Sequence, residues 1–152
     1  MKPFVFRLEA LRKIRTRREE ERQQELAIAA GNYRTAVATL QELQQQLDVL
    51  LVKCEQEKQA GTTISTLIDY ENYLWVLREQ CERQQEAVNH LNEQRVAALK
   101  ALEEAMKERK AVDKLKAKRL EHYEELRLQE EQKVLDELAG AMSQRYQGSD
   151  YE

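Results

Sequence analysis

A single strong turn signal separates two stretches of heptad-patterned sequence. Residues 59–65 read Gln-Ala-Gly-Thr-Thr-Ile-Ser, in which a glycine and several hydroxyl-bearing residues favour a turn over a helix. Thr66 is the predicted N-cap of the helix that follows, and Asp69 suits the positive end of that helix. A chain with one such break can fold into few architectures, and the simplest is two long helices joined by a short turn.

Apolar residues recur at heptad spacing on both sides of this turn. Before the turn, heptad position a holds Leu26, Tyr33, Leu40, Leu47 and Cys54. Position d holds Ala29, Ala36, Leu43, Leu50 and Glu57. After the turn, position a holds Leu67, Leu74, Cys81, Val88, Arg95 and Leu102. Position d holds Tyr70, Leu77, Gln84, Leu91, Ala98 and Ala105. This spacing predicts a coiled-coil seam, and a short turn makes the two helices antiparallel.

The predicted fold class is therefore all-α, with two long helices forming one antiparallel coiled-coil hairpin over residues 1–146. The expected bounds are helix one over about 4–58, the turn over 59–65, helix two over about 66–144 and a disordered tail over 147–152.

The register of the seam has two candidates. In the preferred one, the numbers of facing residues add to 124, so that Leu50 faces Leu74. A register one heptad away, adding to 131, packs almost as well but leaves the start of helix two unpaired. In the preferred register, residues 121–144 have no partner within the chain.

Composition excludes several classes of protein. The chain is 35% charged and 6% aromatic with one proline, so its apolar residues suffice for a stripe but not for a thick core. The sequence shows neither an apolar run of membrane-spanning length nor a signal peptide, so we expect a cytoplasmic protein with Cys54 and Cys81 as reduced thiols. A net charge of −3 gives no general attraction to nucleic acid.

No pattern of reactive side chains predicts catalysis. His90 and His122 are far apart, and Glu86 with His90 is a helical pair of a kind that is common on surfaces. Neither cysteine has a histidine or a second cysteine at a metal or redox spacing, and no glycine-rich phosphate loop is present. We predict no enzyme activity, no cofactor, no metal and no small-molecule substrate.

The sequence around the turn is apolar beyond the seam. A two-stranded coil should carry polar residues there, so these side chains predict either a partner-binding or self-association surface, or a local fold in which Ile64 covers them. The candidate partner-binding residues at this tip are Val49, Leu51, Val52, Ile68, Tyr70, Tyr73, Trp75, Val76 and Leu77.

Basic residues gather in two stretches, one on each predicted helix. Residues 107–119 contain seven basic and two acidic residues, and the preferred register sets them near the basic residues of 12–22. Such a zone is a solvated charged face or a docking surface for an acidic protein. Nucleic acid is disfavoured because no aromatic residues are interleaved with the charge.

Three stretches resemble the FliJ family, coiled-coil components of bacterial flagellar type III protein export. They are Phe4-x-Phe6-x-Leu8-Glu9-x-Leu11 with Arg15 and Glu19-Glu20-Glu21, Tyr70-x-x-Tyr73-Leu74-x-x-Leu77, and Glu131-Gln132-Lys133-x-Leu135-Asp136-Glu137-Leu138-Ala139. The resemblance covers about residues 1–140.

The resemblance implies a helical hairpin akin to the central stalk of rotary ATPases. It implies three partners: the flagellar export ATPase ring, which takes up the end that bears both termini, the cytoplasmic domain of the export gate membrane protein, and export chaperones. It implies a location at the inner face of the cell membrane at the flagellar base. The gate-binding positions would be Tyr73 and Leu77. The candidate ring-end residues are Phe4, Phe6, Leu8, Leu11, Arg15, Arg18, Lys110, Lys114, Lys118, Leu135 and Leu138.

Two other functions fit the same pattern. One is a true central stalk subunit of a rotary ATPase, although such subunits carry a globular part between their helices and the turn here is short. The other is a structural coiled coil that associates with itself through the tip.

Overall fold

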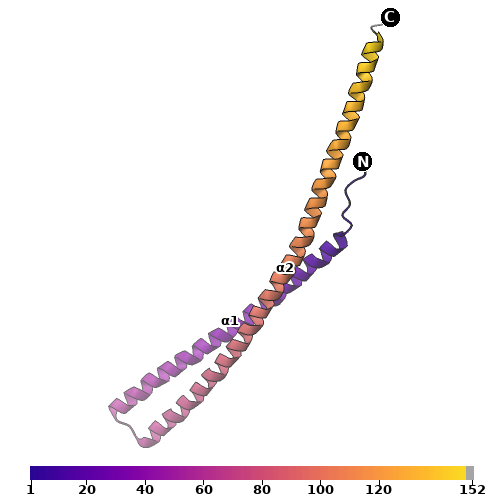
Figure 1. Cartoon of the computed structure of the whole chain (residues 1–152). Coiled ribbons are helices and arrows are strands. Elements are labelled where there is room, and N and C mark those ends of the chain that lie inside the picture. The colour runs from indigo at the N-terminus through magenta and orange to yellow at the C-terminus, as the bar shows by residue number, and fades with distance from the viewer. Residues whose placement is uncertain (150–152) are drawn as a thin grey trace. The chain divides into compact units, whose positions relative to one another are not determined.

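A computed structural model describes residues 1–149 and contains two long α-helices. Helix α1 spans Glu9–Ala60 and helix α2 spans Ile64–Ser149 (Figure 1). The described residues contain no strand. The predicted all-α fold of two long antiparallel helices is confirmed.

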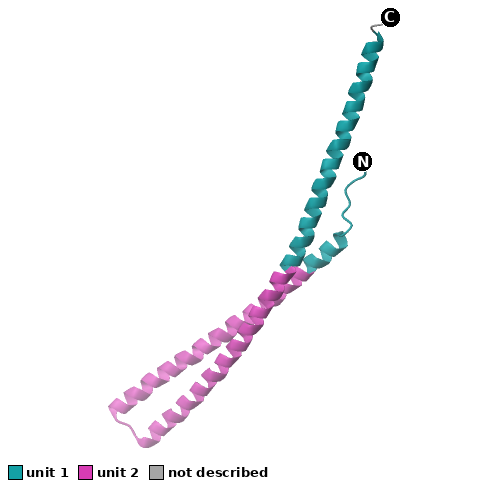
Figure 2. Ribbon diagram, in the orientation of Figure 1, with its two compact units in different colours: residues 1–17, 106–152 teal, residues 18–105 magenta. Residues whose placement is uncertain are grey.

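The chain divides into two compact units, where the sequence predicts a single hairpin. One unit consists of residues 18–105, and the other combines residues 1–17 with the chain from residue 106 onward (Figure 2). Each unit therefore contains a segment of α1 and a segment of α2.

Two apolar clusters hold the 18–105 unit together. Near the turn, Leu50 and Cys54 of α1 pack against Leu74 and Leu77 of α2. Further along, the second cluster is formed by Ala36, Leu40 and Val88. These are the seam residues that the heptad pattern predicts, because residues three and four apart lie on one face of a helix.

Cross-helix contacts identify the register. Within the 18–105 unit, Gln84 donates a hydrogen bond of 3.0 Å from Nε2 to the carbonyl oxygen of Ala36. Within the other unit, Lys116 bonds to Glu9 and the Tyr123 hydroxyl bonds to the Lys2 carbonyl. The numbers in the first pair add to 120 and those in the other two add to 125. The structure therefore has the 124 register rather than the 131 register.

The turn is shorter than predicted, and its cap is a different threonine. Helix α1 continues to Ala60, and Gly61 follows with a φ of 82°, a left-handed conformation that ends helices and favours glycine. The Thr63 hydroxyl accepts a hydrogen bond of 3.2 Å from the Thr66 backbone N–H. Thr63 is therefore the N-cap of α2, and the prediction of Thr66 was wrong by one helical turn.

The first eight residues lie outside α1, which begins at Glu9 rather than near residue 4. In an extended chain, alternate side chains point the same way, whereas in a helix they diverge. The non-helical backbone lets Phe4 reach the Tyr123 ring, at 5.5 Å between centroids, while Phe6 is also buried. Packing of both aromatic rings therefore accounts for the later start of the helix.

The last part of α2 lacks a packed neighbour. Every residue from Glu125 to Ser149 is exposed, in agreement with the expectation that this part finds no partner in the chain. Residues 147–149 belong to α2, whereas the predicted disordered tail includes them; residues 150–152 lie outside the described part.

Two further findings concern the membrane and the cysteines. None of the described helices combines the length and the apolar character that crossing a membrane requires. Cys54 and Cys81 are both free thiols, with Cys54 buried in the cluster near the turn.

Candidate functional site: partner-binding surfaces

Large apolar side chains are exposed on both helices next to the turn. This set, which we call the tip surface, consists of Val49, Leu51, Val52, Ile68, Tyr73, Trp75 and Val76. Trp75 is 63% exposed and Tyr73 is 54% exposed, which is unusual for aromatic side chains. Ile64 is 78% exposed, so it does not cover the tip surface as the alternative of local folding requires.

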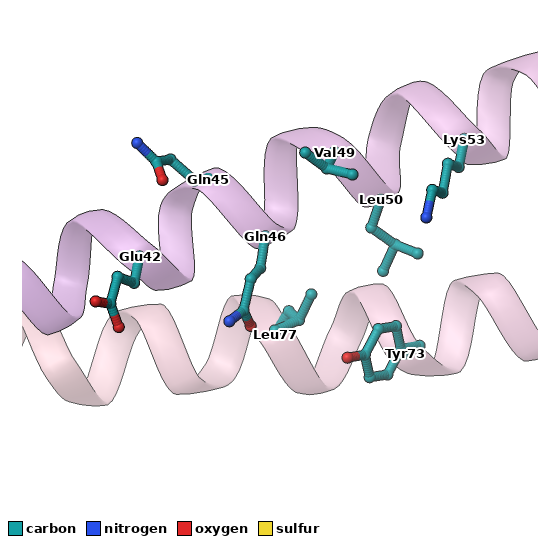
Figure 3. A pocket seen from close by; sticks show the side chains of 8 residues that line it. All are labelled: Glu42, Gln45, Gln46, Val49, Leu50, Lys53, Tyr73 and Leu77. Carbon is teal, nitrogen blue, oxygen red and sulfur yellow. The ribbon is translucent and has the colours of Figure 1, made fainter.

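A cleft of about 420 Å³ between the two helices adjoins the tip surface and shares Val49 and Tyr73 with it. Leu50, Gln46 and Lys53 extend from α1 toward α2 along this cleft, and Tyr73 and Leu77 line it from α2 (Figure 3). The remaining lining residues are Glu42, Gln45 and Val49. The cleft thus has a mixed lining of apolar and polar side chains, as binding sites commonly have.

Two predicted tip residues belong to the core instead. Leu77 is 2% exposed and packs in the cluster with Leu50 and Leu74, so a partner could reach it only through the cleft. Tyr70 is half-buried against the same cluster. Both occupy seam positions, where packing between helices takes precedence over exposure.

The tip surface has two faces. Val49 and Tyr73 line the cleft. Ile68 and Trp75 are seven residues apart, or two helical turns, and therefore share a different face of α2. A partner that contacts both Tyr73 and Trp75 must therefore wrap around the start of α2.

At the predicted ring end, the apolar N-terminal residues are packed rather than exposed. Phe6 is 7% exposed and lies below the Lys116 ammonium and the Arg119 guanidinium, at 6.0 Å and 5.7 Å from its ring centroid. Phe4, Leu8 and Leu11 are each partly buried. These four residues are therefore positioned to hold the N-terminal segment on α2 rather than to present it to a partner.

Several basic residues of the predicted ring end are paired inside the chain. Arg15 forms an ion pair with Glu108, and Arg18 also has an interaction partner. Arg109 contacts Asp113 at 2.8 Å. These interactions explain how so many cations fit close to the seam.

Glu9 is the centre of this charge network, a role that its place in the N-terminal motif does not indicate. Its carboxylate lies 2.7 Å from the Arg12 guanidinium and 3.1 Å from the Lys116 ammonium. Hydrogen bonds from Arg12 first and Lys116 second lower the pKa of Glu9 from 4.5 to about 2. The salt bridge to Lys116 links the first turn of α1 to α2.

Three lysines of the predicted ring end differ from the paired basic residues described above. We call them the lysine row: Lys110, Lys114 and Lys118. They are exposed, and their spacing of four residues places them on one face of α2. None of them makes an ion pair or hydrogen bond with the described residues. Like charges at this spacing repel one another, so the row favours an acidic partner.

Beyond the lysine row, α2 carries an exposed apolar stripe that we call the C-terminal stripe: Leu128, Leu135, Leu138 and Met142. Their exposures range from 56% to 66%. A cleft of about 570 Å³ lies beside the stripe, lined by Met1 and by residues of α2 that include Tyr123, Val134 and Leu135. Tyr123 is a contributor that the sequence analysis missed, although its position opposite the N-terminus follows from the register.

The described residues contain no group of three or more His, Cys, Asp or Glu side chains that could hold a metal ion. On the surface, the side-chain nitrogen Nε2 of Gln94 lies 3.1 Å from Nε2 of His90, at hydrogen-bonding distance. The features that stand out among the described residues are exposed apolar and charged surfaces, which are the kinds of surface that mark interaction sites in proteins.

Comparisons with known proteins give two matches. The sequence profile of one family, described as flagellar FliJ protein, matches residues 4–148. No curated protein matches the chain. Among solved structures, a protein described as a YscO homolog from Chlamydia trachomatis is similar, with 22% sequence identity and a TM-score of 0.44 over 95% of this chain and 98% of that one.

Proposed function

Since this chain belongs to the flagellar FliJ family and is thus a component of the type III export apparatus, we propose that it acts there by binding. It binds the export ATPase ring, promotes assembly of that ring and couples it to the export gate. Export chaperones are further partners. The chain contributes no chemistry of its own to these steps.

The observation that carries the proposal is the tip surface. Interfaces place most of their binding energy in a few aromatic and apolar anchors, and Tyr73 and Trp75 are residues of that kind. They are exposed although the seam beside them is well packed. We assign this surface to the cytoplasmic domain of the export gate protein.

The gate contact is tested by titrating the purified chain with the soluble gate domain in a calorimeter. Tyr73→Ala should weaken binding at least about tenfold, as loss of a hot spot does. Tyr146→Ala is the matched control, because Tyr146 is 80% exposed and distant in sequence from the tip. Equal affinities for the Tyr73→Ala variant and the unmodified chain would contradict the assignment.

The lysine row and the C-terminal stripe support the assignment of the ATPase ring to the other unit. The row offers unpaired positive charge, and the stripe offers apolar area next to it along α2. A partner with an acidic rim and an apolar wall would match both. The ring end of the proposal therefore consists of Lys110, Lys114, Lys118, Leu135 and Leu138, with the N-terminal residues in a supporting role.

Ring assembly provides the second test. Replacement of the three lysines of the row by glutamate should abolish stimulation of ATPase assembly, measured by sedimentation of the ATPase with and without this chain. Binding to the gate domain should be retained by the same variant. Unchanged stimulation would remove the lysine row from the proposal.

One observation weighs against the rival function of a rotary ATPase central stalk. Only residues 61–63 separate α1 from α2. No globular part can be accommodated in three residues, whereas the expectation for such a stalk includes one.

A further inference from the structure

The C-terminal stripe is a surface that this chain leaves uncovered. Leu128, Leu135 and Met142 follow one another at intervals of seven residues, so they lie on one face of α2, and Leu138 adjoins them. All four are more than half exposed. A helix with such a stripe is stabilised mainly by packing against another element, since isolated helices are marginal in water.

Three of the four stripe residues are spaced symmetrically about Leu135. Leu128 precedes it by seven residues and Met142 follows it by seven. A second helix of the same sequence, laid antiparallel across the stripe, would therefore place Leu135 against Leu135 and Leu128 against Met142. Such self-matching patches are what a twofold-symmetric interface requires.

Charged residues at the ends of the stripe match the same antiparallel arrangement. Glu124 lies four residues before Leu128, and Arg145 lies three residues after Met142. An antiparallel pair brings Glu124 of one copy opposite Arg145 of the other at both ends. Arg145 makes no ion pair with the described residues, and Glu124 is held by Arg127 at 3.0 Å. A parallel pair would instead set glutamate against glutamate and arginine against arginine.

The cleft beside the stripe lies where the same arrangement places apolar side chains of the second copy. Its lining combines apolar Tyr123, Val134 and Leu135 with charged Arg127, Glu130 and Glu131, and its volume is about 570 Å³. The antiparallel arrangement brings the region of Leu138 and Met142 of a second copy opposite this cleft. An apolar side chain entering the cleft would extend the interface sideways from the stripe.

From these matches we infer that a second copy of this chain covers the C-terminal stripe, as an antiparallel helix pair centred on Leu135. The proposed ring-end contact uses Leu135 and Leu138 as well, so self-association and ATPase binding would exclude each other. This regulatory consequence rests on the proposed function, whereas the pairing itself does not.

Sedimentation velocity over a wide range of protein concentrations tests the pairing. The unmodified chain should pass from monomer to dimer as its concentration rises. Leu135→Glu should raise the dissociation constant at least about tenfold, because it sets two carboxylates against each other at the twofold axis. Leu126→Glu is the matched control, since Leu126 is also exposed but lies nine residues away, on the opposite face of α2.

Cysteine cross-linking tests the orientation. In a Cys54→Ala, Cys81→Ala background with unchanged helical content by circular dichroism, Leu135→Cys should form a covalent dimer on oxidation and Leu128→Cys should not. Cross-linking of Leu128→Cys to itself would show a parallel pair and overturn the inference, as would a chain that stays monomeric throughout. A monomeric chain that still binds the ATPase would overturn this inference and leave the proposed function intact.

Discussion

At the scale of single residues, Phe6 shows how packing assigns a role that a motif alone does not. It lies in the N-terminal pattern that resembles the FliJ family, and the resemblance implies a contact with the ATPase ring. In the structure, Phe6 is buried beneath Lys116 and Arg119. Its role is therefore to fasten the N-terminal segment to α2.

Phe6→Ala should release that segment. Truncation of a buried phenylalanine costs about 3–5 kcal/mol in a well-packed core, and a smaller loss is expected here because the surroundings are partly solvated. Amide hydrogen exchange should rise in residues 9–17 and 106–123 and stay unchanged in the cluster around Leu74. Val5→Ala is the control, because Val5 is 76% exposed. Equal exchange in the two variants would contradict this role.

The ion pairs of Glu9 predict that the stability of the fold depends on pH. The pKa of Glu9 is about 2 in the folded chain, against 4.5 for a glutamate without these partners. Its ion pairs therefore stabilise the fold fully above pH 4.5. That stabilisation is lost as the pH falls through the range from 4.5 to about 2. NMR titration of the Glu9 side chain should show the low pKa, and Arg12→Met should raise it by removing the largest contributor. An identical pKa in the variant would refute the assigned cause.

At the scale of elements, two glycines have opposite roles. Gly31 lies inside α1 with open space around its Cα, whereas Gly61 has a φ of 82° between the helices. Gly31→Ala should stabilise the chain by up to about 1 kcal/mol through helix propensity. Gly61→Ala should destabilise it by about 1–2 kcal/mol, the cost of a left-handed conformation with a Cβ. Urea unfolding followed by circular dichroism compares them, and equal midpoints would contradict both.

The two helices and their register could be predicted because apolar spacing encodes them directly. Leu50, Leu74 and Leu77 fall on the seam in sequence and are buried in the structure. The start of α2 could not be placed as well, because Thr63 and Thr66 are both good caps. The choice between them depends on where Gly61 ends α1, which is a property of the backbone.

The start of α1 is a second feature that the sequence does not predict correctly. The predicted bounds of helix one, about 4–58, include Phe4 and Phe6. Phe4 and Phe6 are two residues apart, just after Pro3, which is also compatible with an extended segment that places both rings on one side. Only the position of Tyr123 on α2 decides in favour of the extended form, and that contact joins residues far apart in sequence. At the tip, seven of the nine predicted residues are exposed, as positions outside the heptad seam should be, whereas Phe4, Phe6, Leu8 and Leu11 at the ring end are packed in the chain.

At the scale of the whole molecule, the side chains proposed for binding differ from those that pack the fold. Leu74 and Trp75 are neighbours on α2, yet the first is 2% exposed and the second 63% exposed. Leu74→Ala should cost about 2–5 kcal/mol of unfolding free energy. Trp75→Ala should change the unfolding free energy by less than about 0.5 kcal/mol while weakening gate binding. Loss of stability in both variants, measured by urea unfolding, would indicate that Trp75 is a packing residue.

The division into two units predicts that the two proposed partners can be uncoupled. The tip surface belongs to the 18–105 unit, and the lysine row and C-terminal stripe belong to the other. Tyr73→Ala should therefore leave ATPase binding unchanged, and a variant with all three lysines of the row replaced should leave gate binding unchanged. A variant that loses both partners while remaining folded would argue against separate surfaces.

The central claim is that the tip surface is a docking site, and Trp75 reports on it because it is the one tryptophan in the chain. Replacing it biosynthetically with 5-hydroxytryptophan allows its emission to be excited selectively during titration with the soluble gate domain. We predict solvent-exposed emission in the free chain, independent of its concentration, and a change toward a buried environment that saturates on titration. A reporter already buried in the free chain in a concentration-dependent manner, or one that the gate domain leaves unchanged, would contradict the claim.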